Sequence, residues 1–309
     1  MLPPSADDND PHDHLGGGND ENSTARKDSD PTTLSGMAFT TPRVARRARR
    51  ALASLAAAGL VLVLLGYTAA GGALLGSVIV CLTLFEAALL RDLIHEGQLQ
   101  QSALTQVRPL FGEIPAELGG WAADAVLVQY AVRLVADVRP RLVLECGSGS
   151  STIAIARCLK TLGGRLISLE HNPEFARKTT EILRLLELND VARVVTAPLT
   201  TRQVGSAVLS WYGPEYERFL ESPIDVLIVD GPPKASGPRA RYPAVPALKF
   251  RLAPDCWILM DDGDRPDERA IAHAWGEDLG AQLTYLEGGR GGWLLHRTAV
   301  RVASAAVPD

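Results

Sequence analysis

A glutamate and two glycines follow one another closely where an apolar run of the sequence ends. Residues 141–145 form the run and end in Glu145, and Gly147 and Gly149 come directly after it. The residues from Ser151 onward have the composition of a helix. Glycine lets the backbone approach a ligand without an intervening Cβ, and the first N–H groups of a helix are unpaired donors. A strand, a glycine turn and a helix N-terminus in this order predict a site for a nucleotide-like ligand.

A second carboxylate is expected beside this turn. Glu170 ends the next predicted strand, about 20 positions after the glycines, where an acidic residue can accept hydrogen bonds from ribose hydroxyls. Position 152, where a dinucleotide-binding turn has its third glycine, is a threonine. A pyrophosphate needs close backbone approach at that point, so Thr152 counts against a dinucleotide. A nicotinamide-dependent oxidoreductase remains the alternative enzyme.

Three aspartates follow two later apolar runs. Asp230 ends the run 224–229, and Asp261 with Asp262 ends the run 256–260. Parallel strands bring such residues to one edge of a sheet, where they can hold Mg²⁺ together with substrate oxygens. A cation there lowers the pKa of a bound hydroxyl. The alternative is that Asp230 orients a ligand while Asp261 and Asp262 cap the next helix.

Clues to a substrate come from two further groups of side chains. Lys234, Arg239 and Arg241 follow Asp230 and are suited to bind a carboxylate or phosphate. Trp211 and Tyr212 are candidates for an aromatic wall. Both groups are equally compatible with a solvated loop and ordinary packing.

The elements that must position these residues alternate along the chain. Helical stretches separate short β-branched runs, which predicts βαβ units and a Rossmann-like, mainly parallel sheet of seven strands with helices on both faces. A helix is expected from residue 122 until Pro140. The predicted strands cover residues 141–145, 165–169, 192–196, 224–229, 256–260, 281–286 and 292–296.

Two transmembrane helices are expected before this domain. Residues 1–42 form an acidic, polar segment expected to be disordered, and residues 51–85 contain no charged side chain. A single helix of that length would exceed a ~30 Å hydrocarbon core, so a hairpin with spans at about 51–67 and 72–90 is predicted. Its turn is placed at residues 68–71. The predicted parts are therefore a tail (1–42), a membrane hairpin (43–90), a connector (91–120) and a catalytic domain (121–309).

Arginines on both sides of the hairpin indicate its orientation. Five lie between residues 43 and 50, and Arg91 follows the second span. The positive-inside rule places both flanks, and hence the catalytic domain, on the cytoplasmic side of the membrane. A signal peptide is the competing interpretation, but its apolar segment would follow a long acidic tail rather than a short basic start.

Composition narrows the function classes further. The net charge of −5 offers no basic surface for nucleic acid, which we exclude as a partner. The four cysteines are far apart and form no C-x-x-C pair, which suits a reducing compartment.

Residues from about 121 to 297 resemble class I S-adenosylmethionine-dependent methyltransferases, and look closest to a bacterial branch like catechol O-methyltransferase. The motifs that carry the resemblance are residues 142–149, 167–171, 225–231 and 258–262. It implies a seven-stranded sheet whose last strand is antiparallel. Departures lie after the strands, where Pro232 and Pro233 precede Lys234 and where Asp261-Asp262 replaces the usual Asp-Asn pair.

The resemblance implies S-adenosylmethionine as cofactor, with Mg²⁺ as a further possibility, and assigns roles to particular residues. The cofactor contacts are Glu145, Gly147, Gly149, Ser151, Glu170, His171 and Ala197. Asp230 and Lys234 are the expected catalytic side chains, Lys234 as a general base, and Asp230, Asp261 and Asp262 are the expected metal ligands. The expected acceptor is a hydroxyl on a small molecule or on a lipid- or glycan-linked molecule near the membrane. A membrane-tethered binding protein that has lost catalysis is the non-enzymatic alternative.

Overall fold

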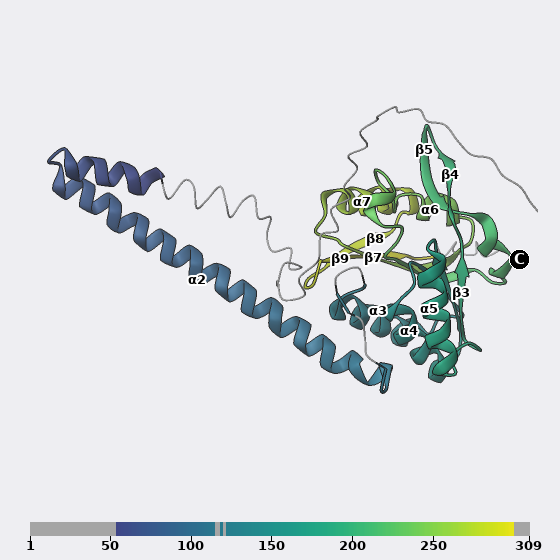
Figure 1. Cartoon of the computed structure of the whole chain (residues 1–309). Coiled ribbons are helices and arrows are strands. Elements are labelled where there is room, and N and C mark those ends of the chain that lie inside the picture. The colour runs from purple at the N-terminus through teal and green to yellow at the C-terminus, as the bar shows by residue number, and fades with distance from the viewer. Residues whose placement is uncertain (1–53, 115–117, 120–121, 300–309) are drawn as a thin grey trace, which may run out of the picture. The chain divides into compact units, whose positions relative to one another are not determined.

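The computed structural model describes residues 54–114, 118–119 and 122–299. Its centre is a seven-stranded sheet with the order β3-β2-β1-β6-β7-β9-β8 (Figure 1). All neighbouring strands from β3 to β7 pair in parallel, and β9 is antiparallel to both β7 and β8. The predicted mainly parallel, Rossmann-like sheet with an antiparallel last strand is confirmed.

The seven predicted strands are all present, with ends that differ by a few residues. The sheet consists of β1 (Leu142–Cys146), β2 (Arg165–Glu170), β3 (Ala192–Thr196), β6 (Ile224–Val229), β7 (Leu252–Asp261), β8 (Gln282–Leu286) and β9 (Gly292–Arg297). The chain first builds outward from β1 through β2 to β3 and then returns to add β6 on the other side of β1. This reversal creates a crevice at the carboxyl ends of β1 and β6, where open α/β sheets bind their ligands.

Helices cover both faces of the sheet, as predicted (Figure 1). One face packs against α3 (Ala125–Val138), α4 (Ser150–Leu162) and α5 (Pro173–Leu185), and the other against α6 (Ala244–Leu248) and α7 (Pro266–Leu279). Side chains of β1 alternate between the two cores: Leu144 and Cys146 belong to the α6 and α7 side, and Val143 belongs to the α4 side. Both faces of the sheet are therefore buried, which explains why the sequences of its strands are continuous apolar runs.

A two-stranded antiparallel hairpin between β3 and β6 was not expected from the sequence. It consists of β4 (Leu199–Val204) and β5 (Ala207–Tyr212), joined by Gly205 and Ser206. Most of β4 is polar or exposed, so it lacks the buried apolar pattern by which the sheet strands were found. The hairpin places Trp211 and Tyr212, both of which are buried, at the end of β5.

A helical pair precedes the α/β domain, but its turn differs from the prediction. The first helix has Ser54–Leu64 among the described residues, and α2 (Thr68–Val107) follows, continued by the 3-10 turn η1 (Arg108–Phe111). The predicted turn at 68–71 is wrong, because these residues form the start of α2 and the chain reverses at residues 65–67 instead. Gly66, with φ of 88°, supplies the left-handed backbone of that reversal. Of the later glycines, Gly71 lies in the contact between the two helices, whereas nothing lies within 4 Å of the place that a Cβ on Gly72 would take.

Close contact between these two helices depends on Gly71. A Cβ on Gly71 would lie 2.6 Å from Val63 Cγ2 and 2.7 Å from the Gly59 carbonyl oxygen. Small residues of this kind allow two helices to approach closely. The C-terminal part of α2 packs on α3, where Arg133 donates to Gln106 at 2.7 Å, and on the loop before β9, where the Gly289 N–H donates to Glu96 at 2.7 Å.

One helix of the described residues is long and apolar enough to cross a membrane. It runs from Thr68 to Phe111 when η1 is counted with α2. The helix Ser54–Leu64 is shorter, about 16 Å at ~1.5 Å per residue, so two complete spans are not established. The acidic tail and the five arginines before the hairpin lie outside the described residues, and the proposed division of the chain at 42, 90 and 120 stays a prediction.

Candidate active site

A cavity of about 510 Å³ opens at the carboxyl ends of β1, β2 and β6. The glycine turn and Glu170 line one side of it, and the residues after β6 and β7 line the other. The lining residues are Ala122, Ala123, Gly147, Ser148, Gly149, Ser150, Ser151, Glu170, His171, Phe175, Tyr212, Asp230, Gly231, Pro233, Lys234, Ala235, Arg241, Asp262, Arg265 and Arg290. The two predicted halves of a site, one for a nucleoside and one for a second reactant, thus face a single cavity.

Gly147 is required by both its conformation and its neighbours. Its φ of 97° is in the left-handed region, and a Cβ there would lie 3.3 Å from the backbone nitrogen of Gly231. Backbone bonds tie the same strand ends together, because the Gly231 N–H donates to the Cys146 carbonyl at 2.7 Å and the Gly147 N–H donates to that of Leu169 at 2.8 Å. The turn is therefore held rigidly against the neighbouring strands.

Glu145 is placed differently from the prediction. Its carboxylate is completely buried on the α4 side of the sheet and is not among the cavity-lining residues. It accepts hydrogen bonds from Ser151 Oγ and Thr152 Oγ1, both at 2.6 Å, and Thr152 Oγ1 in turn accepts one from the Gly149 N–H at 2.9 Å. Glu145 therefore stabilises the glycine turn from the α4 side of the sheet. Thr152, which occupies the position of the third glycine in a dinucleotide-binding turn, belongs to the same hydrogen-bond network.

Burial of Glu145 makes folding stability depend on pH. Desolvation, partly offset by hydrogen bonds from Ser151 and Thr152, raises the pKa of Glu145 from 4.5 to about 7. Between these two pKa values the folded protein binds the extra proton, so the free energy of unfolding falls as pH rises, by roughly 3 kcal/mol in total.

Glu145→Gln carries no titrating proton and should lose this part of the pH dependence. The check is the difference in unfolding midpoint between pH 4.5 and pH 8 for the purified full chain. Glu174→Gln, which changes an exposed glutamate, should keep the wild-type slope, and an equal slope in Glu145→Gln would contradict the assignment.

Glu170 lies on the cavity wall with its carboxylate fixed in place. Oε2 accepts hydrogen bonds from the Ser148 N–H at 3.0 Å and from Ser148 Oγ at 3.2 Å, and Oε1 accepts one from the Asn172 N–H at 2.8 Å. His171 Nδ1 is 3.0 Å from Oε1. These bonds hold an acceptor group at the strand end, beside the glycine turn, in the position the sequence predicted.

The other expected cofactor residues divide into two groups. Gly149, Ser151 and His171 line the cavity together with Gly147 and Glu170. Ala197 is buried and does not line the cavity, although its N–H donates to the Glu170 carbonyl at 2.8 Å. Its role in the structure is to hold the end of β2.

The three aspartates converge, as predicted from the strand order. One carboxylate oxygen from each of Asp230, Asp261 and Asp262 lies within 4.8 Å of the others. Asp230 and Asp262 line the cavity, whereas Asp261 is buried behind them. Asp262 has a φ of 60°, a left-handed conformation that aspartate tolerates better than most residues.

The sequence did not reveal that these carboxylates are surrounded by arginines. Arg241 Nη2 lies 2.6 Å from Asp262 Oδ2 and 3.2 Å from Asp230 Oδ1, and Arg290 Nη2 lies 2.6 Å from Asp261 Oδ2. Arg290 stands among four glycines at positions 288, 289, 291 and 292, between the last two strands. An arginine with two glycines on each side was the available signal, since glycines let the loop fold over the sheet edge.

The residues predicted to bind an acceptor lie in different surroundings in the structure. Arg241 is buried against the aspartates, and Arg239 stacks on the Tyr242 ring at 4.0 Å, so neither extends as a free loop cation. Lys234 lies at the cavity wall, with Nζ 3.7 Å from Asp267. Tyr212 lines the cavity, and its buried hydroxyl has no hydrogen-bond partner among the described protein groups.

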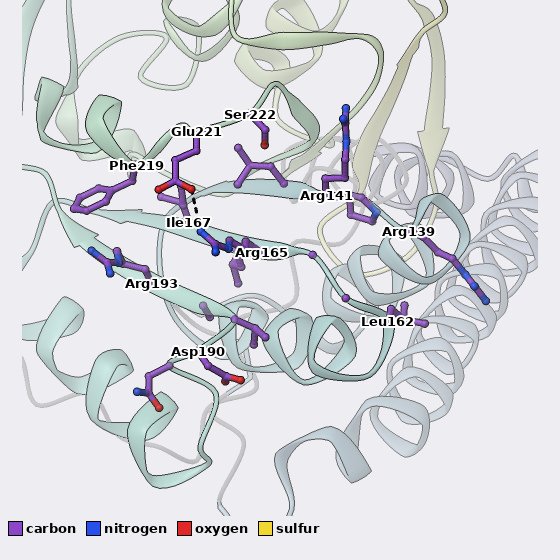
Figure 2. A pocket seen from close by; sticks show the side chains of 18 of the residues that line it. Arg139, Arg141, Leu162, Arg165, Ile167, Asp190, Arg193, Phe219, Glu221 and Ser222 are labelled. Atoms are coloured by element: carbon purple, nitrogen blue, oxygen red, sulfur yellow. Dashed lines mark hydrogen bonds and ion pairs between the residues drawn. The ribbon is translucent and has the colours of Figure 1, made fainter.

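A larger cavity, of about 1030 Å³, lies at the opposite edge of the sheet, around the amino ends of β1, β2 and β3 (Figure 2). Arginines dominate its wall, and Arg165 pairs there with Glu221 at 3.1 Å. The lining arginines are Arg139, Arg141, Arg165, Arg193 and Arg218. No residue of the glycine turn and none of the three aspartates lines it. Volume alone therefore does not identify the site of chemistry, and the smaller cavity has the reactive groups.

The match to a family model agrees with this assignment. Residues 144–263 match the family model of a methyltransferase domain. Similar solved structures include an SAH-bound methyltransferase of Podospora anserina (14% identity, covering 69% of this chain and 96% of that one, TM-score 0.48). Another is an O-methyltransferase of Bacillus cereus in complex with SAH (20% identity, 64% and 90% covered, TM-score 0.44). Among proteins of curated function, none matches the sequence.

The fold and the site together define the class. The glycine turn after β1, Glu170 at the end of β2 and the antiparallel β9 at one side of a parallel sheet form a Rossmann-like methyltransferase domain. Residues 144–263 therefore form a methyltransferase domain, and the protein is a methyltransferase.

Proposed function

We propose that the enzyme transfers a methyl group from S-adenosylmethionine to a hydroxyl oxygen, with Asp230 positioning the acceptor. The observation that carries this proposal is that Asp230 and the glycine turn line the same cavity. Asp230 is therefore the carboxylate that an acceptor meets beside a cofactor bound at the turn. The nicotinamide-dependent and catalytically inactive alternatives are not favoured.

The cofactor half of the cavity is formed by β1, β2 and the residues after them. Glu170 is positioned to accept hydrogen bonds from ribose hydroxyls, and the glycine turn allows close backbone approach. Phe175, an exposed ring on the same wall, offers an apolar surface for a base. The unpaired Tyr212 hydroxyl is a further polar group that a bound ligand can satisfy.

The acceptor half is formed by the residues after β6 and β7. When bound, S-adenosylmethionine supplies a methyl group on a sulfonium; the acceptor oxygen bonds to that carbon as the carbon–sulfur bond breaks, leaving a neutral thioether. Asp230 accepts the hydroxyl proton or its hydrogen bond and thereby orients the oxygen for in-line attack. Lys234 is paired with Asp267 rather than desolvated, so we assign it to binding an anionic group of the acceptor at the cavity rim.

The direct test is transfer of a labelled methyl group to a panel of hydroxylated acceptors by the purified full chain. The panel should contain catechols, hydroxylated lipids and glycan-linked lipids, each with an amine analogue in place of the hydroxyl. We expect label on at least one hydroxyl compound and none on its amine analogue. Transfer to the amines alone would overturn the assignment to oxygen.

We further propose that the helical pair anchors the enzyme in the membrane with its catalytic domain in the cytoplasm. Support comes from the uncharged run 51–85 and from exposed apolar side chains such as Leu64, Ile79 and Leu84 on the described helices. A C-terminal alkaline phosphatase, active only outside the cytoplasm, should stay silent, whereas a C-terminal green fluorescent protein should be bright and sediment with membranes. The opposite pair of signals would contradict the orientation, and a soluble fluorescent fusion would contradict the anchor.

A further inference from the structure

Arg241 occupies the space between the carboxylates at the ends of β6 and β7. Its Nη2 is 2.6 Å from Asp262 Oδ2 and 3.2 Å from Asp230 Oδ1. The same guanidinium donates to two backbone carbonyls, from Nη1 to Asp261 at 2.7 Å and from Nη2 to Asp230 at 2.5 Å. The side chain is almost completely buried, at 4% exposure. It therefore joins the two strand ends through both backbone and side-chain groups and is held from several directions.

Two more arginines pair with the same aspartates. Arg290 Nη2 is 2.6 Å from Asp261 Oδ2, and Arg265 Nη1 is 2.7 Å from Asp262 Oδ2. The three aspartates thus face three guanidinium groups, and two further carboxylates lie nearby, Glu268 at 3.6 Å from Arg265 and Asp124 at 3.9 Å from Arg290. Burial by itself lowers the pKa of Arg241, but the neighbouring Asp230, Asp262 and Asp261 outweigh burial and raise the pKa above its ordinary value. The guanidinium is therefore held in its charged form.

This arrangement does not fit the divalent cation that the family resemblance implies. A bound Mg²⁺ requires carboxylate oxygens at about 2.0–2.1 Å with near-octahedral geometry. The oxygens of Asp230 and Asp262 that face each other are already joined by the Arg241 guanidinium. A cation would have to share that space with a fixed positive charge, or displace a buried arginine from two carboxylates and two carbonyls. Repulsion among the three aspartates, the reason for expecting a metal, is opposed by the arginines that pair with them.

We propose that the Arg241 guanidinium takes the place of the divalent cation at this sheet edge, so that the enzyme holds Asp230 toward its acceptor without a metal. Arg241 is a positioning residue: it contacts Asp230 through Nη2 and fixes the carboxylate of a residue that lines the cavity. A planar guanidinium suits this task because its donors reach several oxygens in fixed directions, which lysine cannot do. The consequence for methyl transfer rests on the proposed function, whereas the consequence for metal binding does not.

Manganese binding tests the proposal independently of catalysis. Mn²⁺ is added to the detergent-solubilised full chain, and bound ion is measured by loss of the free-ion paramagnetic resonance signal. We expect no stoichiometric binding to the wild type at submillimolar Mn²⁺. One tight ion per chain in the wild type, lost in Asp262→Asn, would overturn the proposal.

Removing the guanidinium should create the site that it now fills. Arg241→Ala exposes Asp230 and Asp262 to each other, and we expect the variant to bind one Mn²⁺ at least tenfold more tightly than wild type, about the effect of removing one adjacent positive charge. Arg239→Ala, two residues away and not in contact with the aspartates, is the matched control and should resemble wild type. If Arg241→Ala does not fold, the comparison is made with Arg241→Gln. Equal Mn²⁺ affinity in a folded Arg241 variant and wild type would count against the proposal.

Activity provides the second arm once a methyl acceptor is found. EDTA should leave turnover of the wild type within about twofold of its untreated value, because no cation is needed to hold the carboxylates. A loss of tenfold or more that added Mg²⁺ restores would overturn metal independence, with a factor of ten corresponding to about 1.4 kcal/mol. If no methyl transfer is detected at all, the proposed function fails while the manganese measurements still decide the role of Arg241.

Discussion

Glu170→Ala should weaken binding of S-adenosylmethionine by about 100-fold. The carboxylate is held at the cavity wall by Ser148 and Asn172, and it is the acidic group at the strand end where ribose hydroxyls are expected. A hydrogen bond to a charged group contributes about 1.5–3 kcal/mol, and a 100-fold loss, about 2.8 kcal/mol, corresponds to the loss of one such bond to a ribose hydroxyl. Isothermal titration calorimetry of the full chain with S-adenosylhomocysteine measures the effect.

Two controls separate loss of binding from loss of structure. Glu174→Ala removes an exposed glutamate four positions later that does not line the cavity, and it should leave affinity unchanged. Glu170→Ala itself should retain a cooperative unfolding transition, because its carboxylate lies at a sheet edge. Wild-type affinity in a folded Glu170→Ala protein would show that the cofactor does not use this strand end.

Asp230→Asn should reduce methyl transfer by about 100-fold or more while leaving cofactor affinity nearly unchanged. The amide retains the size of the side chain and can still accept from Arg241, but it is a far weaker proton acceptor than a carboxylate. Removing a positioned general base typically costs 10²–10⁴-fold in rate. Single-turnover transfer and calorimetry, performed on the same preparation, separate the chemical step from cofactor binding.

The matched control for Asp230 lies at the other end of the same strand. Asp225 pairs with Arg141 at the amino edge of the sheet, remote from the glycine turn, so Asp225→Asn should affect stability rather than turnover. Comparable rate losses in both variants would indicate a general effect on the fold. A full rate in Asp230→Asn would remove this residue from the acceptor side of the mechanism.

Most of the sheet could be predicted because buried parallel strands have an unmistakable composition. Continuous apolar runs ending in Glu170, Asp230 and Asp261 indicated both the strands and the edge at which their carboxyl ends meet. The hairpin of β4 and β5 was not predicted, because one of its strands is polar and the pair is not part of the main sheet. Its Tyr212 nevertheless reaches the cavity.

The orientation of Glu145 shows what motif reasoning overlooked. Side chains alternate along a strand, so Glu145 shares a face with Val143 and points toward α4 rather than into the cavity. Its partner Thr152 belongs to the turn itself, and the two residues had to be considered together. The motif correctly predicted the position of the glycine turn. It wrongly predicted that the Glu145 side chain faces the cavity.

The arginine cluster could not be predicted from spacing alone. Arg241 and Arg290 are 49 positions apart, in a loop before α6 and in the loop before β9, and only the fold brings both to Asp261 and Asp262. The sequence contains many arginines, and nothing local distinguishes a buried one from a solvated one. The carboxylates could be predicted because they stand at the ends of predicted strands, whereas the arginines that pair with them lie in loops.

Calorimetric titration of the full-length wild-type protein with S-adenosylhomocysteine tests the central claim most directly. We expect one site per chain with a dissociation constant in the micromolar range, on the order of −8 kcal/mol, abolished or greatly weakened by Glu170→Ala. NADH should produce no saturable heat. Absence of binding by S-adenosylhomocysteine, or saturable binding of NADH at the same site, would contradict the account.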